Sequence, residues 1–221
     1  MVRDLGARHG LQTLGFETSG IQKPTVADMA TAVDDMLAKY PFLALRGIRL
    51  ADFKGIASHA GRDQADQHQD REARTPAWIL IDQSLAANPI PQGETAGQTS
   101  QPQPRPDDRP MYAAVVHAIG RILETTAGTQ PRQLAESALI TEYQRISGPW
   151  TTDTLATVVD GYRSWRAQLN PACFTDRRLD RPSALIEAFT EVELHNDHAC
   201  GPAKVLHRLI VEHARERSNT Q

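Results

Sequence analysis

The residues whose types and spacing are best suited to metal binding or catalysis lie in the segment YAAVVHAIGRILE, residues 112–124. Apolar residues recur there every three or four positions, which predicts a helix. Residues four apart share one face of a helix. In the motif His-Glu-x-x-His, two imidazoles at that spacing bind zinc, and the intervening glutamate activates the zinc-bound water. His117 stands at the first position, but Ala118 replaces the glutamate and Arg121 replaces the second histidine.

These replacements oppose zinc chemistry in three ways. A catalytic zinc needs three protein ligands and one open position, and His117 supplies a single ligand. The guanidinium of Arg121 is always protonated and repels a dication. Ala118 can neither accept nor donate a proton, so a general base is missing. Taken alone, His117 reads as a polar residue at the edge of a core.

A second group of metal-binding residue types stands in the segment ELHNDHAC, residues 193–200. His195, Asp197, His198 and Cys200 crowd this segment, and such clusters can bind transition metals. The alternative interpretation, which we favour, makes Asn196 and Asp197 turn and cap residues between two helices.

Hydrophobic periodicity predicts the elements that position these residues. A short strand is expected within 10–17, a helix over 24–40, and strands over 45–53 and 77–81. The polar run 62–74 reads as a solvated loop or helix face. Apolar stripes predict helices over 112–123, 139–146, 155–169, 185–192 and 205–210. A helix, then strands, then a series of helices indicates an α+β fold with a small N-terminal strand layer packed on a mainly helical second half.

The expected organisation is a single domain over residues 1–221 with two polar segments. Residues 88–110 are rich in proline and glutamine, with almost nothing to bury, and are expected to form a flexible insertion or linker. Residues 214–221 are expected to form a polar tail.

Four phrases of the chain resemble, in order, the zincin-like metallopeptidase domains of actinobacteria and their phages, a family similar to the catalytic domain of anthrax lethal factor. These are KYPFLALRGIRLAD, WILIDQSLAANP, YAAVVHAIGR and SALIEAFTEVELHNDHACGPAKVLHRLI. The resemblance runs from about residue 10 to residue 213. It implies a zincin-like fold, a zinc cofactor in active members, and an origin in a phage or prophage.

The resemblance also implies a role for residues of a later helix. The family's third zinc ligand is the first glutamate of that helix, and Ser183 stands there instead. Glu187 matches a second glutamate that supports the metal site, and Ala172 aligns with a tyrosine that assists the reaction. We therefore expect zinc to be lost. Arg121 and Glu187 could then form an ion pair where the metal once joined two helices.

Composition narrows the classes of partner. The chain has 221 residues and a formal net charge of -3, so neither nucleic acid nor membrane is an expected partner. The absence of a recognisable signal peptide or apolar span predicts a cytoplasmic or phage-associated protein. Cys173 and Cys200 could pair, but are expected to stay reduced in that compartment.

The preferred hypothesis is a catalytically inactive zincin-like homologue that acts as a module for binding an unknown protein or peptide, or as a structural module. The first alternative is an active zinc metalloendopeptidase with a reorganised site, in which His195, His198 or Glu187 would join His117. The second is a helical interaction protein unrelated to zincins.

Overall fold

The computed structural model describes residues 2–16, 21–51, 58–61, 76–83, 86, 109–148 and 154–220. The chain forms two compact units, Met1–Ile122 and Leu123–Gln221. The proline- and glutamine-rich segment lies outside the described residues up to position 108, as does the polar run 62–74.

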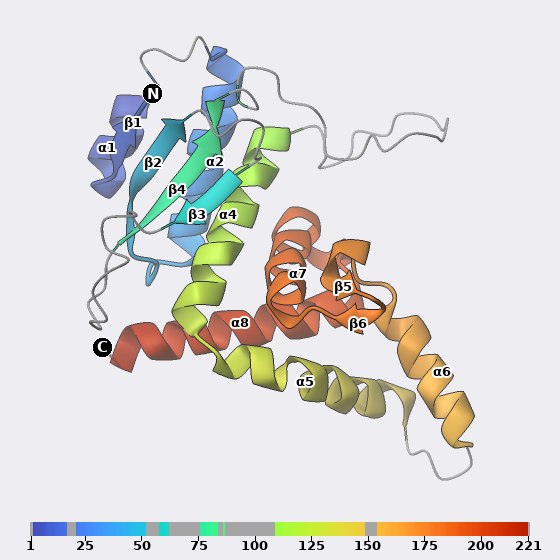
Figure 1. Ribbon diagram of the computed structural model, residues 1–221. Helices are drawn as coiled ribbons and strands as arrows, with labels where there is room; N and C mark the ends of the chain where they lie inside the picture. Colours follow the sequence, from blue (N-terminus) through green and yellow to red (C-terminus); the bar gives the residue numbers. More distant parts are fainter. Residues whose placement is uncertain are drawn as a thin grey trace, which may run out of the picture. The chain divides into compact units, whose positions relative to one another are not determined.

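A four-stranded sheet forms the centre of the first unit (Figure 1). Its strands are β1 (Gln12–Leu14), β2 (Leu45–Ala51), β3 (Ser58–Gly61) and β4 (Ala77–Asp82), in the order β1-β2-β4-β3. The pairs β1–β2 and β2–β4 are parallel, and β3 is antiparallel to β4 at the edge. Ile48 and Ile79 are register partners and fully buried. The three strands predicted from sequence are confirmed, whereas β3 was not predicted.

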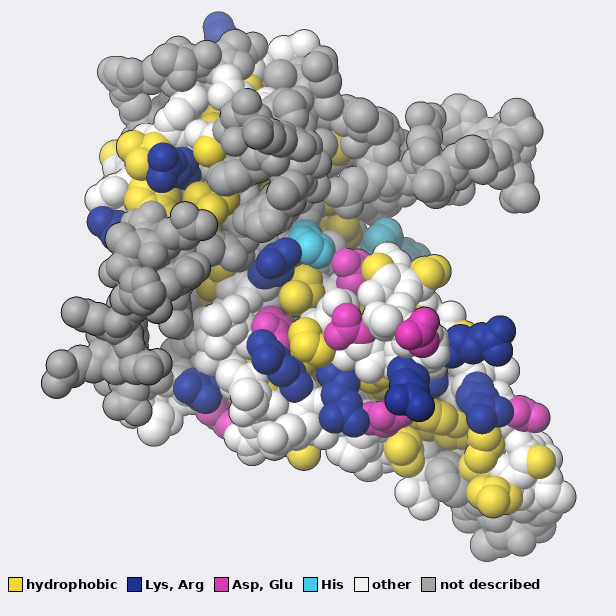
Figure 2. All heavy atoms as spheres, viewed as in Figure 1, with side chains coloured by type: hydrophobic (Ala, Val, Ile, Leu, Met, Phe, Trp, Pro, Cys, Tyr) yellow, Lys and Arg dark blue, Asp and Glu magenta, His cyan; other side chains and the backbone are white. Residues whose placement is uncertain are grey.

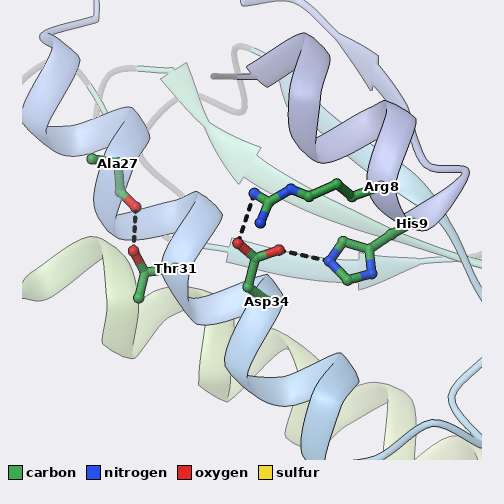
Figure 3. A network of polar contacts seen from close by, with 5 residues as sticks. All are labelled: Arg8, His9, Ala27, Thr31 and Asp34. Atoms are coloured by element: carbon green, nitrogen blue, oxygen red, sulfur yellow. Dashed lines mark hydrogen bonds and ion pairs between the residues drawn. The ribbon is translucent and has the colours of Figure 1, made fainter.

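The first unit also contains α1 (Val2–His9), α2 (Lys23–Lys39) and the larger part of α4 (Pro110–Ala127). The predicted helix over 24–40 is confirmed, and Met29, Val33 and Met36 form its buried stripe. Helix α1 was not predicted. Figure 3 shows how it is tied to α2: the Asp34 carboxylate accepts from Arg8 at 2.8 Å and pairs with His9 Nε2 at 2.6 Å.

The second unit is mainly helical. It contains α5 (Gln130–Ser147), α6 (Leu155–Arg166), α7 (Arg181–His195) and α8 (Gly201–Thr220). Two 3-10 turns, η3 (Pro171–Cys173) and η4 (Asn196–His198), flank α7 on its two sides in sequence. Between η3 and α7 lies a two-stranded hairpin of β5 (Phe174–Thr175) and β6 (Arg178–Leu179). The four helices were predicted, whereas the hairpin was not.

The core of the second unit lies between α5, α7 and α8. Its fully buried side chains include Leu139, Leu185, Phe189, Leu206 and Ile210. A polar pair accompanies this apolar core: His207 Nε2 lies 2.8 Å from Glu193 Oε1, and the imidazole stacks on the Phe189 ring. Glu193 is nearly inaccessible, so the bond satisfies a buried carboxylate.

Several predicted boundaries differ from the structure. The helix predicted over 139–146 begins nine residues earlier, at Gln130. The stripe of 155–169 forms a helix that ends at Arg166, and none of the residues of α6 is buried. Residues 214–220, expected to be a polar tail, continue helix α8, and Ala214 is fully buried. Ala214 is the last buried residue of this helix, and residues 215–220 are exposed or half-buried although they stay helical.

The α+β class is confirmed, since a mainly helical chain contains a small, largely parallel sheet. Sheet and helices α5–α8 belong to different units. None of the helices described combines the length and the apolarity that a membrane span requires.

Candidate functional site

The N-terminal end of α4 is anchored within the first unit. Arg109 Nε donates to Asp28 Oδ1 at 2.7 Å, and the Tyr112 hydroxyl donates to Asp35 Oδ2 at 3.0 Å. Both acceptors lie on α2. The helix that carries His117 therefore has a defined position against α2.

The burial of α4 follows the helical period that its sequence predicts. Val115, Ala118 and Ile119 are fully buried, whereas His117 and Arg121 are half-buried. Positions 117 and 121 are four apart and share a face. Ala118 belongs to the buried face, so this position holds a methyl group in the core where the motif would hold a glutamate.

The side chains on this face do not fit a catalytic zinc. His117 offers one imidazole, and the next position on the face carries the guanidinium of Arg121. A site with one neutral donor beside a permanent cation lacks the three ligands that a catalytic zinc needs. Across the described part of the chain, no group of three or more His, Cys, Asp or Glu side chains is arranged to hold a metal ion.

The later helix named by the resemblance is α7, in the second unit. Ser183 lies in its first turn, and the hydroxyl donates to Asp180 Oδ2 at 2.9 Å. Glu187, one turn on, has its Oε2 3.5 Å from Asn170 Nδ2. His117 and Arg121 belong to the first unit and Glu187 to the second, so the proposed Arg121–Glu187 ion pair stays a prediction.

The aligned tyrosine position, Ala172, is an exposed residue of η3. Tyr143 and Tyr162 lie instead in an aromatic cluster with Trp165, between α5 and α6. The centroid of the Tyr143 ring lies 5.7 Å from the centroid of the Tyr162 ring and 5.7 Å from that of the Trp165 ring. Burial raises the pKa of Tyr162. The two tyrosines thus join the helices to each other.

The segment 193–200 is a helix end and a turn, as expected. Asn196 caps α7 with a positive φ of 48°, and its N–H donates to the Val192 carbonyl. His195 Nδ1 lies 3.0 Å from the Glu191 carbonyl oxygen, while His198 is exposed in η4. The next helix, predicted over 205–210, is α8, which begins at Gly201.

Two thiols lie near this turn, and both are free. Burial, followed by the nearby Glu187 and Glu191 carboxylates, raises the pKa of Cys173 to about 12. Burial also raises the pKa of Cys200 to about 11, and the Cys200 N–H donates to Glu191 Oε1 at 2.8 Å. The thiolate is the reactive form, so both residues are poor nucleophiles at neutral pH.

Comparison of the chain with protein-family models, with curated proteins and with solved structures finds no match.

Proposed function

We propose that this chain is a catalytically inactive zincin-like metallopeptidase homologue that serves as a protein-binding or structural module. The proposal joins two things: the ordered phrases that resemble the family, and the residues on the half-buried face of α4. That face keeps His117 and carries Arg121 one turn later.

The observation that carries the proposal is the burial of Ala118 beside this pair. A fully buried alanine between His117 and Arg121 leaves the helix well packed but without a general base. The helix thus keeps the scaffold role of a zinc helix while lacking the groups that would bind metal and move a proton. An α+β fold with α4 in the same unit as the sheet supports this reading.

The first test is the metal content of the purified full-length protein by mass spectrometry, after dialysis against trace zinc. We expect well below one zinc per chain. One tightly bound zinc per chain would overturn the proposal and support the active enzyme with a reorganised site.

The second test restores the family's ligand set with the triple variant Ala118→Glu, Arg121→His and Ser183→Glu. In a zincin fold the glutamate at position 183 would be the third ligand, so we expect the variant to bind zinc at least roughly tenfold more tightly than an isolated His pair does. Arg217→His is the matched control, because it places a second imidazole four residues after His213 on α8. Equal zinc affinities of the two variants would count against the zincin assignment.

A further inference from the structure

A groove lined by arginines crosses the second unit beside the β5–β6 hairpin. One part, about 750 Å³ in volume, is lined by Arg163, Arg166 and Arg177 together with Leu169, Pro171 and Phe174. A second part, about 430 Å³, shares Arg166 and Arg177 and adds Arg178 and Arg181. Figure 2 shows several basic side chains on this face of the second unit, with acidic side chains among them.

One arginine of the groove is held rigidly. The Arg166 side chain is half-buried, its Nη1 donates to Glu136 Oε1 at 3.0 Å, and its guanidinium lies over the rings of Tyr162 and Phe174. Glu136 also lies 3.6 Å from Arg181 Nη2. Glu136 is the single carboxylate among the residues that line the two parts.

The other arginines keep donors available. Arg163 meets Asp160 at 3.6 Å, with both side chains largely exposed. Arg177 and Arg178 are exposed, and neither has an ion-pair partner among the residues that the structure describes. A neighbouring surface hollow beside the hairpin is lined by Arg178 together with the carboxylates Asp176 and Asp180. The lining of the groove proper carries five arginines against Glu136.

The backbone at Arg177 is a second, independent observation. Asp176 and Arg177 form the two-residue loop of the hairpin with φ of 50° and 64°. A loop of this kind strongly favours Asn-Gly or Asp-Gly, because both residues need positive φ. Arginine in this conformation is strained, and strained residues cluster at functional sites, where the position of a side chain matters. Here it holds a guanidinium at the junction of the two parts of the groove.

We infer that this groove binds an acidic peptide segment of a partner protein. The planar guanidinium forks match carboxylates in geometry and charge. Leu169, Pro171 and Phe174 line the larger part and offer an apolar surface for one side chain of the peptide. The chemistry thus fits an apolar residue flanked by Asp or Glu. Every residue of the groove belongs to the second unit, so the groove goes beyond the zincin assignment and does not depend on it.

The test is fluorescence anisotropy of the full chain with a labelled peptide Asp-Glu-Leu-Glu-Asp in 50 mM salt. The neutral peptide Asn-Gln-Leu-Gln-Asn is the ligand control. We expect saturable binding of the acidic peptide, at least tenfold weaker binding of the neutral one, and a loss of affinity in 500 mM salt as charges are screened.

Substitutions of groove residues test whether the peptide binds in the groove. The double variant Arg163→Gln and Arg177→Gln is expected to lose at least tenfold in affinity. Arg208→Gln, which removes one exposed charge from α8 outside the groove, is expected to bind as the wild type does. Circular dichroism checks that each variant is folded, and Arg177→Gln alone serves if the double variant is not.

Three outcomes would overturn the inference. The first is no saturable binding up to roughly 1 mM peptide, which would mean a binding free energy weaker than about 4 kcal/mol. The second is an equal loss of affinity in Arg208→Gln. The third is tighter binding of a single-stranded oligonucleotide of the same charge, which would make the groove a nucleic-acid surface.

Discussion

At the scale of single residues, the hairpin loop Asp176–Arg177 carries a conformational cost. Aspartate tolerates positive φ because its short polar side chain bonds locally, whereas arginine has no such compensation. The strain lies in a residue that lines the proposed peptide groove. Stability and binding should therefore respond to Arg177 in opposite directions.

Arg177→Gly is expected to raise the free energy of unfolding by about 1 kcal/mol, because glycine adopts positive φ without steric cost. Urea denaturation measures the change. Asp176→Gly is the matched control and should gain less, since aspartate already tolerates the conformation. A destabilised Arg177→Gly would contradict the strained loop.

The thiols are the second residue-scale feature with a measurable consequence. At pH 8, iodoacetamide is expected to alkylate Cys173 far more slowly than the same thiol in urea, because burial keeps it protonated and inaccessible. Cys200, which is half-buried, should react at an intermediate rate. Peptide mass spectrometry assigns each rate, and equal rates in the folded and unfolded protein would refute the prediction.

The raised pKa of the Cys173 thiol predicts how the stability of the protein changes with pH. The pKa of Cys173 is raised from its ordinary value of 9.0 to about 12 on folding. Between those values the unfolded chain binds fewer protons than the folded one, so stability falls as pH rises. The stability of Cys173→Ala should fall less steeply over that range.

At the scale of elements, each unit contains a close contact between neighbouring elements that a substitution can test. In the sheet, the Cα of Gly47 faces strand β1 so closely that an added Cβ would lie 2.1 Å from the Gln12 carbonyl oxygen. It would also lie 2.8 Å from the Trp78 ring. A glycine is thus required where β1, β2 and β4 meet.

Gly47→Ala is expected to destabilise the first unit by more than about 2 kcal/mol, because neither a strand backbone nor a buried indole can move aside cheaply. Arg49→Ala, an exposed change on the same strand, is the control and should be nearly neutral. Thermal unfolding followed by Trp fluorescence compares them. A neutral Gly47→Ala would mean that β1 does not pair with β2 as described.

In the second unit, the Glu193–His207 bond joins α7 to α8. Glu193→Ala is expected to cost about 2–3 kcal/mol, because it leaves the imidazole of His207 without its buried partner. Glu212→Ala removes an exposed carboxylate from α8 and should change the stability little. Urea denaturation distinguishes the two, and equal effects would show that the buried bond contributes nothing.

At the scale of the whole molecule, zinc is the ligand that separates the proposed inactive homologue from an active enzyme. A ligand that binds the folded chain raises its melting temperature, and one that does not bind leaves it unchanged. We expect neither zinc nor EDTA to shift the melting temperature of the wild type measurably. The variant Ala118→Glu, Arg121→His and Ser183→Glu should gain roughly 5 °C at a zinc concentration about 100 times its Kd.

A rise of several degrees for the wild type in zinc, reversed by EDTA, would contradict this expectation. If the control Arg217→His gained as much in zinc as the restored variant, any His pair four residues apart on a helix would explain the gain. The gain would then not support a zincin site.

Local patterns in the sequence determined much of the architecture. Apolar residues three and four apart marked α2, α4, α7 and α8. Near-alternation marked β2, and a continuous apolar run marked β4, because each pattern reports how one element is buried. The identities at positions 117, 118 and 121 were readable for the same reason, since residues four apart on a helix share a face whatever surrounds it. Asn196 as a helix cap followed from its residue type.

Tertiary structure decided what depends on residues far apart in the chain. Strand β3 and the β5–β6 hairpin are too short for a periodic signal, and the hairpin loop has Asp-Arg where Asp-Gly would have marked it. The arginine groove draws on α6, the η3 region, the hairpin and α7, and Glu193 finds His207 on another helix. Such sites arise from packing, because a window of sequence records the burial of each residue but not the partner it meets.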